Sequence, residues 1–245
     1  MKTIIETELM CDVCEQNEGF ASAVIVAAGN STRMGGTSKQ TLLLGGIPVI
    51  ARTLLAFERT AAIKNIVLVT RESDILPLQQ LVQKYMISKV TDIIVGGNCR
   101  EESVKNGINR LNTDTEYVLI HDGARPLVTT SVIEAVALAT KEKKCVSCAV
   151  PVKDTIKVVK DGIVEQTLDR SQLVSIQTPQ GFKYSLFREC INGIDNLEVY
   201  TDDCAVVEAC GYAVSIVEGD YNNIKITTPE DIAVAEGILR CKGEI

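Results

Sequence analysis

The sequence has few aromatic residues and no tryptophan: phenylalanine and tyrosine together supply only 4% of the chain. Proteins that bind single-stranded nucleic acid commonly stack bases on aromatic side chains, so this class is disfavoured. Positive charge is also in deficit, with 25 Lys and Arg against 32 Asp and Glu and a net charge of −7. That balance excludes a general binder of phosphate backbones, which depends on clustered basic residues. A small basic pocket within an acidic surface remains compatible with it.

Long apolar runs are missing as well. No run approaches the roughly 20 residues that a membrane-spanning helix needs. The first 20 residues hold five carboxylates and lack the apolar core of a secretory signal. We therefore expect a cytoplasmic protein without membrane or nucleic-acid partners. Residues 1–20 are treated as an extension of unknown role, and residues 21–245 as a single domain, long enough to bury a sizeable core.

Histidine occurs once, at His121, which argues against a histidine-based metal site or a catalytic triad. Cysteine is comparatively abundant, with nine residues that include two CxxC pairs, Cys11–Cys14 and Cys145–Cys148. These pairs lie much farther apart than the roughly 15–20 residues usual in a structural zinc site. The second pair falls in a predicted strand, where residues three apart point to opposite faces. We expect the cysteines to be mostly buried packing residues.

Strand-like apolar runs alternate with helical periodicities along most of the chain. The predicted strands are Ser22–Ala28, Lys64–Thr70, Asp92–Val95, Tyr117–Ile120, Cys145–Val150 and Ala213–Val217. The predicted helices are Pro48–Glu58, Ile75–Tyr85, Glu101–Leu111, Thr129–Lys141, Tyr184–Cys190, Asp202–Cys210 and Pro229–Leu239. Short joints between such units predict an α/β fold with a doubly wound, mostly parallel, Rossmann-like sheet.

The segment 151–180 interrupts this alternation. Two short runs, Lys157–Lys160 and Ile163–Thr167, flank the pair Asp161-Gly162, which is typical of tight hairpin turns. A hairpin inserted into an α/β sheet predicts an arm that protrudes from the domain.

Ligands of doubly wound sheets bind beyond the carboxyl ends of the strands, so the segments that follow strands are candidate sites. After the first predicted strand, the small residues Ala27, Ala28 and Gly29 precede the cations Arg33 and Lys39. Small residues let main-chain N–H groups approach a phosphate chain, and cations neutralise it. The segment matches neither a Walker A loop nor the GxGxxG fingerprint.

Two further strand ends carry matching chemistry. The third predicted strand is followed by Gly97, Asn98, Arg100 and Ser103. These residues lie at the start of a predicted helix, where main-chain N–H groups favour anions. Asp122 and Gly123 follow the fourth strand, and a carboxylate beside phosphates is a natural magnesium ligand. Together with Lys225, these strand ends predict a pocket for a nucleoside triphosphate and magnesium.

Short motifs occur in fixed order from about Ser22 to Leu239. They read AAGNSTRMG, SKQ, GGNCREESV, HDGARP, PVKDTIK, LDR, QTPQGF, TDD and NIKIT. This series resembles the 2-C-methyl-D-erythritol 4-phosphate cytidylyltransferase family of the non-mevalonate isoprenoid pathway. The resemblance implies magnesium-dependent transfer of CMP from CTP to methylerythritol phosphate, by in-line attack on the α-phosphorus with release of pyrophosphate.

The resemblance also implies roles for single residues. The implied catalytic residues are Arg33, Lys39, Arg170 and Lys225, and the implied magnesium ligand is Asp122. The implied nucleotide-binding residues are Ala27, Ala28, Gly29, Gly97, Asn98, Arg100, Ser103 and Gly123. The implied acceptor-binding residues are Arg125, Thr155, Arg170, Thr178, Thr201 and Lys225. Because the family interlocks two subunits through the arm, a homodimer is implied in which Thr155 and Arg170 serve the partner's site.

Some positions depart from the family pattern. Ser31 and Ser38 stand where a glycine and a proline are typical, and Asn98 stands where an aspartate is frequent. The nearest alternative activity is a ribitol 5-phosphate cytidylyltransferase, which differs in the acceptor. A nucleotide-dependent oxidoreductase would carry GxGxxG and an acidic residue after the second strand, which instead runs into Thr70-Arg71. A non-catalytic nucleotide-binding protein would not require the retained cations.

Overall fold

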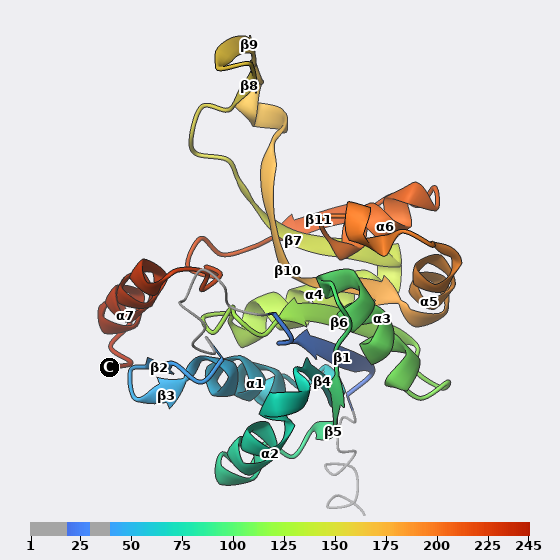
Figure 1. Ribbon diagram of the computed structural model, residues 1–245, viewed down its shortest axis with the longest axis vertical. Helices are drawn as coiled ribbons and strands as arrows, with labels where there is room; N and C mark the ends of the chain where they lie inside the picture. Colours follow the sequence, from blue (N-terminus) through green and yellow to red (C-terminus); the bar gives the residue numbers. More distant parts are fainter. Residues whose placement is uncertain (1–18, 30–39) are drawn as a thin grey trace, which may run out of the picture.

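A seven-stranded sheet forms the centre of the computed structural model, which describes residues 19–29 and 40–245 (Figure 1). The strand order is β11-β7-β10-β6-β1-β4-β5. The strands are β1 (Ala21–Val26), β4 (Ile63–Thr70), β5 (Val90–Val95), β6 (Tyr117–Asp122), β7 (Cys145–Pro151), β10 (Val174–Lys183) and β11 (Ser215–Glu218). Only β10 runs antiparallel to its neighbours, β6 and β7, within this sheet. The predicted α/β fold with a mostly parallel sheet is confirmed.

The central strands are apolar on both faces, as strands covered by helices on both sides require. In β1, Ala23 and Ile25 pack into one core and Val24 packs into the other. The register of β1 places Val26 opposite Val69 of β4 and Asp122 of β6. The carboxyl ends of these three strands therefore meet at one edge of the sheet.

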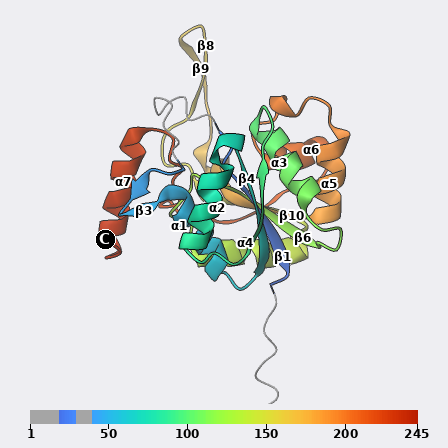
Figure 2. The ribbon, with the colours of Figure 1, turned by 60° about the horizontal axis from the view of Figure 1, so that its bottom comes forward.

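Helices cover both faces of the sheet, as Figure 2 shows. One face is covered by α1 (Val49–Arg59), α2 (Ile75–Lys84) and α4 (Thr130–Lys143). The other face is covered by α3 (Arg100–Arg110), α5 (Tyr184–Gly193) and α6 (Asp203–Ala209). The last helix, α7 (Pro229–Cys241), packs beside the small hairpin of β2 (Leu43–Leu44) and β3 (Ile47–Pro48). Short 3₁₀ turns occur at Glu72–Asp74, Arg170–Gln172 and Leu197–Val199.

The hairpin of β8 (Lys157–Lys160) and β9 (Ile163–Thr167) projects from the body as an arm (Figure 1). Its turn residues Asp161 and Gly162 have φ values of 49° and 78°, the left-handed conformation that tight hairpin turns need. The predicted arm boundary at residue 180 requires correction, because β10 belongs to the central sheet. The segment 177–182 of β10 is buried between β6 and β7.

The described cysteines are free thiols, and four of them are buried: Cys145, Cys148, Cys190 and Cys204. Cys145 and Cys148 pack into the two different cores on either side of β7. The prediction that their side chains point to opposite faces of the strand is confirmed. Cys11 and Cys14 lie outside the described residues. Within residues 19–29 and 40–245, no group of three or more His, Cys, Asp or Glu is placed to hold a metal ion. In the same ranges, no helix combines the length and apolar character needed to traverse a bilayer.

Candidate active site

A cavity of about 450 Å³ opens at the carboxyl ends of the central strands. Its lining residues are Val26, Ala28, Gly29, Gln40, Gly97, Asn98, Cys99, Arg100, Ser103, Asp122, Ala124 and Lys225. Six of the eight residues predicted to bind the nucleotide thus line one cavity. The other two, Ala27 and Gly123, do not line the cavity, although the chain neighbours on both sides of each do. A Cβ atom on Gly123 would come within 2.8 Å of Cδ1 of Ile50 and 3.2 Å of Cβ of Ala27, so any larger residue there would have to displace the Ile50 side chain.

A second cavity, of about 650 Å³, adjoins the first on the side of β10 and α6. Four predicted acceptor-binding residues line it: Arg125, Thr178, Thr201 and Lys225. Arg100, Asp122 and Lys225 line both cavities and form a shared wall. A ligand in each cavity would therefore meet the other at these three side chains.

Thr155 and Arg170 line neither cavity. Both lie exposed on the arm, and Arg170 donates from Nη1 to the carbonyl oxygen of Lys153 at 2.8 Å. Within one chain, the structure does not bring these two predicted residues to the site. Arg33 and Lys39, together with the departures at Ser31 and Ser38, lie outside the described residues.

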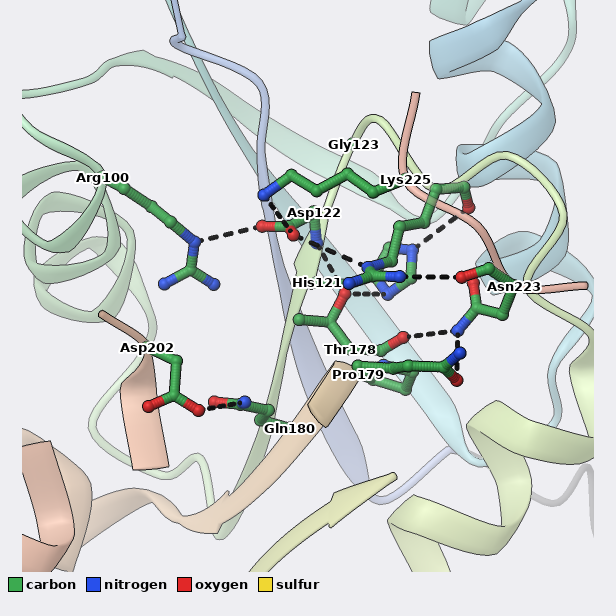
Figure 3. A network of polar contacts seen from close by, with 12 residues as sticks. Arg100, His121, Asp122, Gly123, Thr178, Pro179, Gln180, Asp202, Asn223 and Lys225 are labelled. Carbon is green, nitrogen blue, oxygen red and sulfur yellow. Dashed lines mark hydrogen bonds and ion pairs between the residues drawn. The ribbon is translucent and has the colours of Figure 1, made fainter. Parts of the chain in front are cut away.

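Asp122 is the electrostatic centre of the shared wall (Figure 3). Its Oδ1 atom accepts a hydrogen bond from Nε of Arg100 at 3.0 Å. Its Oδ2 atom lies 2.8 Å from Nζ of Lys225 and 3.6 Å from Nε of Arg125. Burial alone would raise the pKa of the Asp122 carboxyl, but these three cations hold that pKa far below its usual range. Asp122 is therefore ionised at any pH at which the protein works.

Asp122 is fixed through its main chain by Thr178 of the neighbouring strand β10. The hydroxyl oxygen of Thr178 accepts a hydrogen bond from the main-chain N–H of Asp122 at 3.1 Å and lies 3.0 Å from Nδ1 of His121. Burial lowers the pKa of His121 to about 3, so the imidazole is neutral. Nε2 of His121 faces the carbonyl oxygen of Arg125 at 3.4 Å, and because that oxygen can only accept, we assign the ring proton to Nε2. In this tautomer the Thr178 hydroxyl donates to Nδ1. Thus the single histidine supports the site without lining either cavity.

Gln180, also on β10, fixes the start of α6. Its Nε2 atom donates to Oδ2 of Asp202 at 2.8 Å, and its Oε1 atom accepts from the main-chain N–H of Cys204 at 3.1 Å. The residue between these two partners, Asp203, is fully buried and binds Arg100 through both carboxylate oxygens. The TDD motif contains Asp203, but strand-end reasoning gives it no role because it begins a helix.

The loop after β5 is held by its own side chains. The Ser103 hydroxyl accepts from the main-chain N–H of Gly97 at 3.0 Å and donates to the carbonyl oxygen of Cys99 at 2.9 Å. Ser103 therefore shapes the loop, and a direct contact with a nucleotide would compete with these bonds. A Cβ atom on Gly96 would lie 2.5 Å from Cβ of Ala28, so glycine lets the two strand-end loops touch.

Gln40 lies in the wall of the first cavity beside the first loop. Its side chain is buried, and its Oε1 atom has no hydrogen-bond partner among residues 19–29 and 40–245. A buried unpaired amide oxygen is unfavourable in the free protein. The motif SKQ includes this residue, but sequence patterns alone give no sign that its amide is buried and unpaired.

Comparison with known proteins identifies the relatives of this chain. Residues 21–241 match the family model described as 2-C-methyl-D-erythritol 4-phosphate cytidylyltransferase. A protein of that name from Bacillus thuringiensis (strain Al Hakam) is 47% identical over 218 residues, which cover 88% of this chain and 96% of the relative. One from Clostridium novyi (strain NT) is 47% identical over 222 residues, which cover 89% and 95%.

Solved structures agree with this match. The crystal structure of 4-diphosphocytidyl-2C-methyl-D-erythritol synthase from Anaerococcus prevotii has a TM-score of 0.80 and 32% sequence identity, and the alignment covers 92% of this chain and 98% of that one. The matched residues include the sheet, the described walls of both cavities and the arm. The chain therefore belongs to the 2-C-methyl-D-erythritol 4-phosphate cytidylyltransferase family.

Proposed function

We propose that the protein transfers the cytidylyl group of CTP to 2-C-methyl-D-erythritol 4-phosphate. The products are 4-diphosphocytidyl-2-C-methyl-D-erythritol, an intermediate of isoprenoid biosynthesis, and pyrophosphate. The observation that carries the proposal is the wall shared by the two cavities, where Arg100, Asp122 and Lys225 face both. A reaction that joins two phosphorylated substrates needs two adjoining sites with cations at their junction.

The chemistry needs no nucleophile from the protein. An oxygen of the acceptor's phosphate forms a bond to the α-phosphorus of CTP, while the bond from that phosphorus to the bridging oxygen breaks. Pyrophosphate then leaves with the electron pair of the broken bond. Positioning of the two phosphates and neutralisation of their charge are what the enzyme must supply.

Each cavity has the donors that its proposed ligand requires. CTP would lie in the first cavity, along the main chain of the Ala28–Gly29 and Gly97–Asn98 loops. The acceptor would lie in the second cavity, on Arg125 and Thr201. Lys225 is the more exposed of the two cations of the shared wall, with 36% of its side chain exposed against 22% for Arg100. We propose that it turns from Asp122 to a phosphate when substrate binds. Arg33 and Lys39 are proposed to neutralise the triphosphate from the first loop.

Asp122 is the only carboxylate that lines the first cavity in the described part of the chain, which decides how a magnesium ion could bind. Mg²⁺ is commonly held by one or two carboxylates together with substrate phosphates and water. The donor set therefore fits magnesium when a triphosphate supplies further ligands and draws Lys225 away from Asp122. We propose that the ion, bound in this way, neutralises phosphate charge.

The arm supports a homodimer. Ile163 and Val159 on the hairpin are 71% and 55% exposed, and both strands are exposed along their length. An isolated two-stranded hairpin is marginally stable in water, so its apolar residues gain from a covering surface. A second copy of the chain is the proposed cover, with Thr155 and Arg170 reaching the partner's acceptor cavity.

The test is pyrophosphate release from CTP with a panel of polyol phosphates. We expect turnover with methylerythritol phosphate and little with ribitol 5-phosphate. ATP, GTP and UTP serve as controls for the nucleotide. Turnover with ribitol 5-phosphate alone would establish the alternative cytidylyltransferase.

A further inference from the structure

Arg100 stands in the wall between the two cavities, and all three nitrogens of its guanidinium face carboxylates. Nε donates to Oδ1 of Asp122 at 3.0 Å, as Figure 3 shows. Nη1 and Nη2 donate to the two carboxylate oxygens of Asp203, at 3.1 and 2.8 Å. A two-pronged contact of this kind fixes the plane of the guanidinium as well as its position.

Asp203 itself is fully buried and lines neither cavity, so a bound substrate would meet Arg100 and not Asp203. Its main chain is fixed on both sides, because Gln180 of β10 binds the side chain of Asp202 and the N–H of Cys204. A buried ion pair contributes little net stability compared with apolar packing of the same volume. The position that it imposes on Arg100 is therefore its main effect on the site.

Asp122 links this pair to the reacting groups. The Oδ1 atom of Asp122 accepts a hydrogen bond from Arg100, while its Oδ2 atom lies 2.8 Å from Nζ of Lys225. If the guanidinium were free to turn, Asp122 would lose a fixed partner and shift toward Lys225 or Arg125. Both cavities would then lose the alignment of their shared wall.

We propose that Asp203 is a positioning residue for cytidylyl transfer, which acts by holding Arg100 between the nucleotide and acceptor cavities. This inference rests on the proposed function. Misplacement of a catalytic group by about 1 Å can reduce turnover by about 100-fold, because the reacting atoms no longer meet in line. Arg100 is one of twelve described residues that line the first cavity, so the affinity for CTP should change much less than turnover.

The test is the variant Asp203→Asn, which keeps the size of the side chain and removes its charge. We expect kcat for pyrophosphate release to fall by about 100-fold, while the Kd of CTP from calorimetry changes by less than about threefold. Val206→Ala is the matched control, because Val206 is a buried apolar residue of the same helix and is not a partner in the ion pair. It should lower the melting temperature while kcat stays within about twofold of wild type, measured well below that temperature.

A double-mutant cycle separates positioning from general structural damage. If Asp203 acts through Arg100, Asp203→Asn costs about 100-fold in the wild-type background and less than about threefold in an Arg100→Ala background. Equal losses in the two backgrounds would overturn the proposal, as would unchanged kcat in Asp203→Asn. Should Asp203→Asn fail to fold, Asp203→Glu keeps the charge but displaces the guanidinium, and a loss of kcat at constant Kd is again expected.

The two hypotheses fail in different ways. A wild-type enzyme that released no pyrophosphate with any polyol phosphate would refute the proposed function. If the wild-type enzyme is active but the losses of kcat from Asp203→Asn and Arg100→Ala simply add, only the role of Asp203 is refuted.

Discussion

At the scale of single residues, the site is a set of charges whose protonation states follow from burial and neighbours. Strand-end reasoning identified Asp122, Arg100 and Lys225 because such reasoning depends only on where strands finish. It could not identify Asp203, because the carboxylate reaches the site from the start of a helix 103 positions from Arg100. Burial and long-range pairing of this kind leave no local pattern in a sequence.

His121 provides a residue-scale prediction, since it is the only histidine in the chain. Its pKa is lowered to about 3 in the folded protein, below the unfolded value of 6.5. The unfolded state therefore binds a proton that the folded state does not, and stability falls as the pH drops below 6.5 toward 3. Between about pH 7.5 and pH 5.0, we expect His121→Gln to lose about 2 kcal/mol less stability than wild type in urea titrations. Parallel losses in the two proteins would show that His121 is not held neutral.

At the scale of elements, β10 matters most because it joins the sheet to the site. Its central residues, Gln177 to Gln180, include a proline and few strong strand formers, and the pairing register shifts there. Neither strand propensity nor an alternation of apolar and polar residues therefore indicated a strand at β10. The other strands of the sheet were predicted from their apolar runs, which in β1, β4, β6 and β7 are buried on both faces. The arm was predicted from its turn residues, and only its boundary was misplaced.

Thr178 carries the prediction that belongs to this element. Thr178→Val keeps the shape of the side chain but leaves the Asp122 N–H and His121 Nδ1 without partners. We expect the free energy of unfolding in urea to fall by about 2–4 kcal/mol, because two buried polar groups become unsatisfied. The matched control is Thr140→Val, since the Thr140 hydroxyl donates to the Val136 carbonyl of its own helix, and it should cost less than about 1 kcal/mol. Equal losses of unfolding free energy in the two variants would contradict the role of β10 in fixing Asp122 and His121.

At the scale of the whole molecule, one chain contains both cavities, whereas Thr155 and Arg170 lie away from them on the arm. The chain has a net charge of −7, yet Arg100, Arg125 and Lys225 line the cavities at the strand ends. A homodimer with exchanged arms would complete each acceptor cavity with residues of the partner. Neither composition nor strand periodicity predicts such an assembly, because it depends on a surface between two chains.

Mixing two inactive variants tests this exchange. Arg170→Ala and Lys225→Ala homodimers should each lose about 100-fold in turnover, because every site lacks one cation. A mixed dimer would hold one site with both residues intact, so equal mixing followed by refolding should restore about one quarter of the wild-type rate. Absence of any recovery, with mixed dimers verified by mass, would contradict the exchange, because it would show that no site combines Arg170 of one chain with Lys225 of the other.

The central claim, that two phosphates are joined across the shared wall of Arg100, Asp122 and Lys225, has a direct test by ³¹P nuclear magnetic resonance. CTP and methylerythritol phosphate are incubated with the enzyme and Mg²⁺, and the phosphorus signals are followed over time. We predict that the acceptor phosphate and the α-phosphorus of CTP become a coupled pair of diphosphate signals while free pyrophosphate accumulates. Unchanged substrates, or conversion of CTP to CDP and inorganic phosphate, would contradict the account.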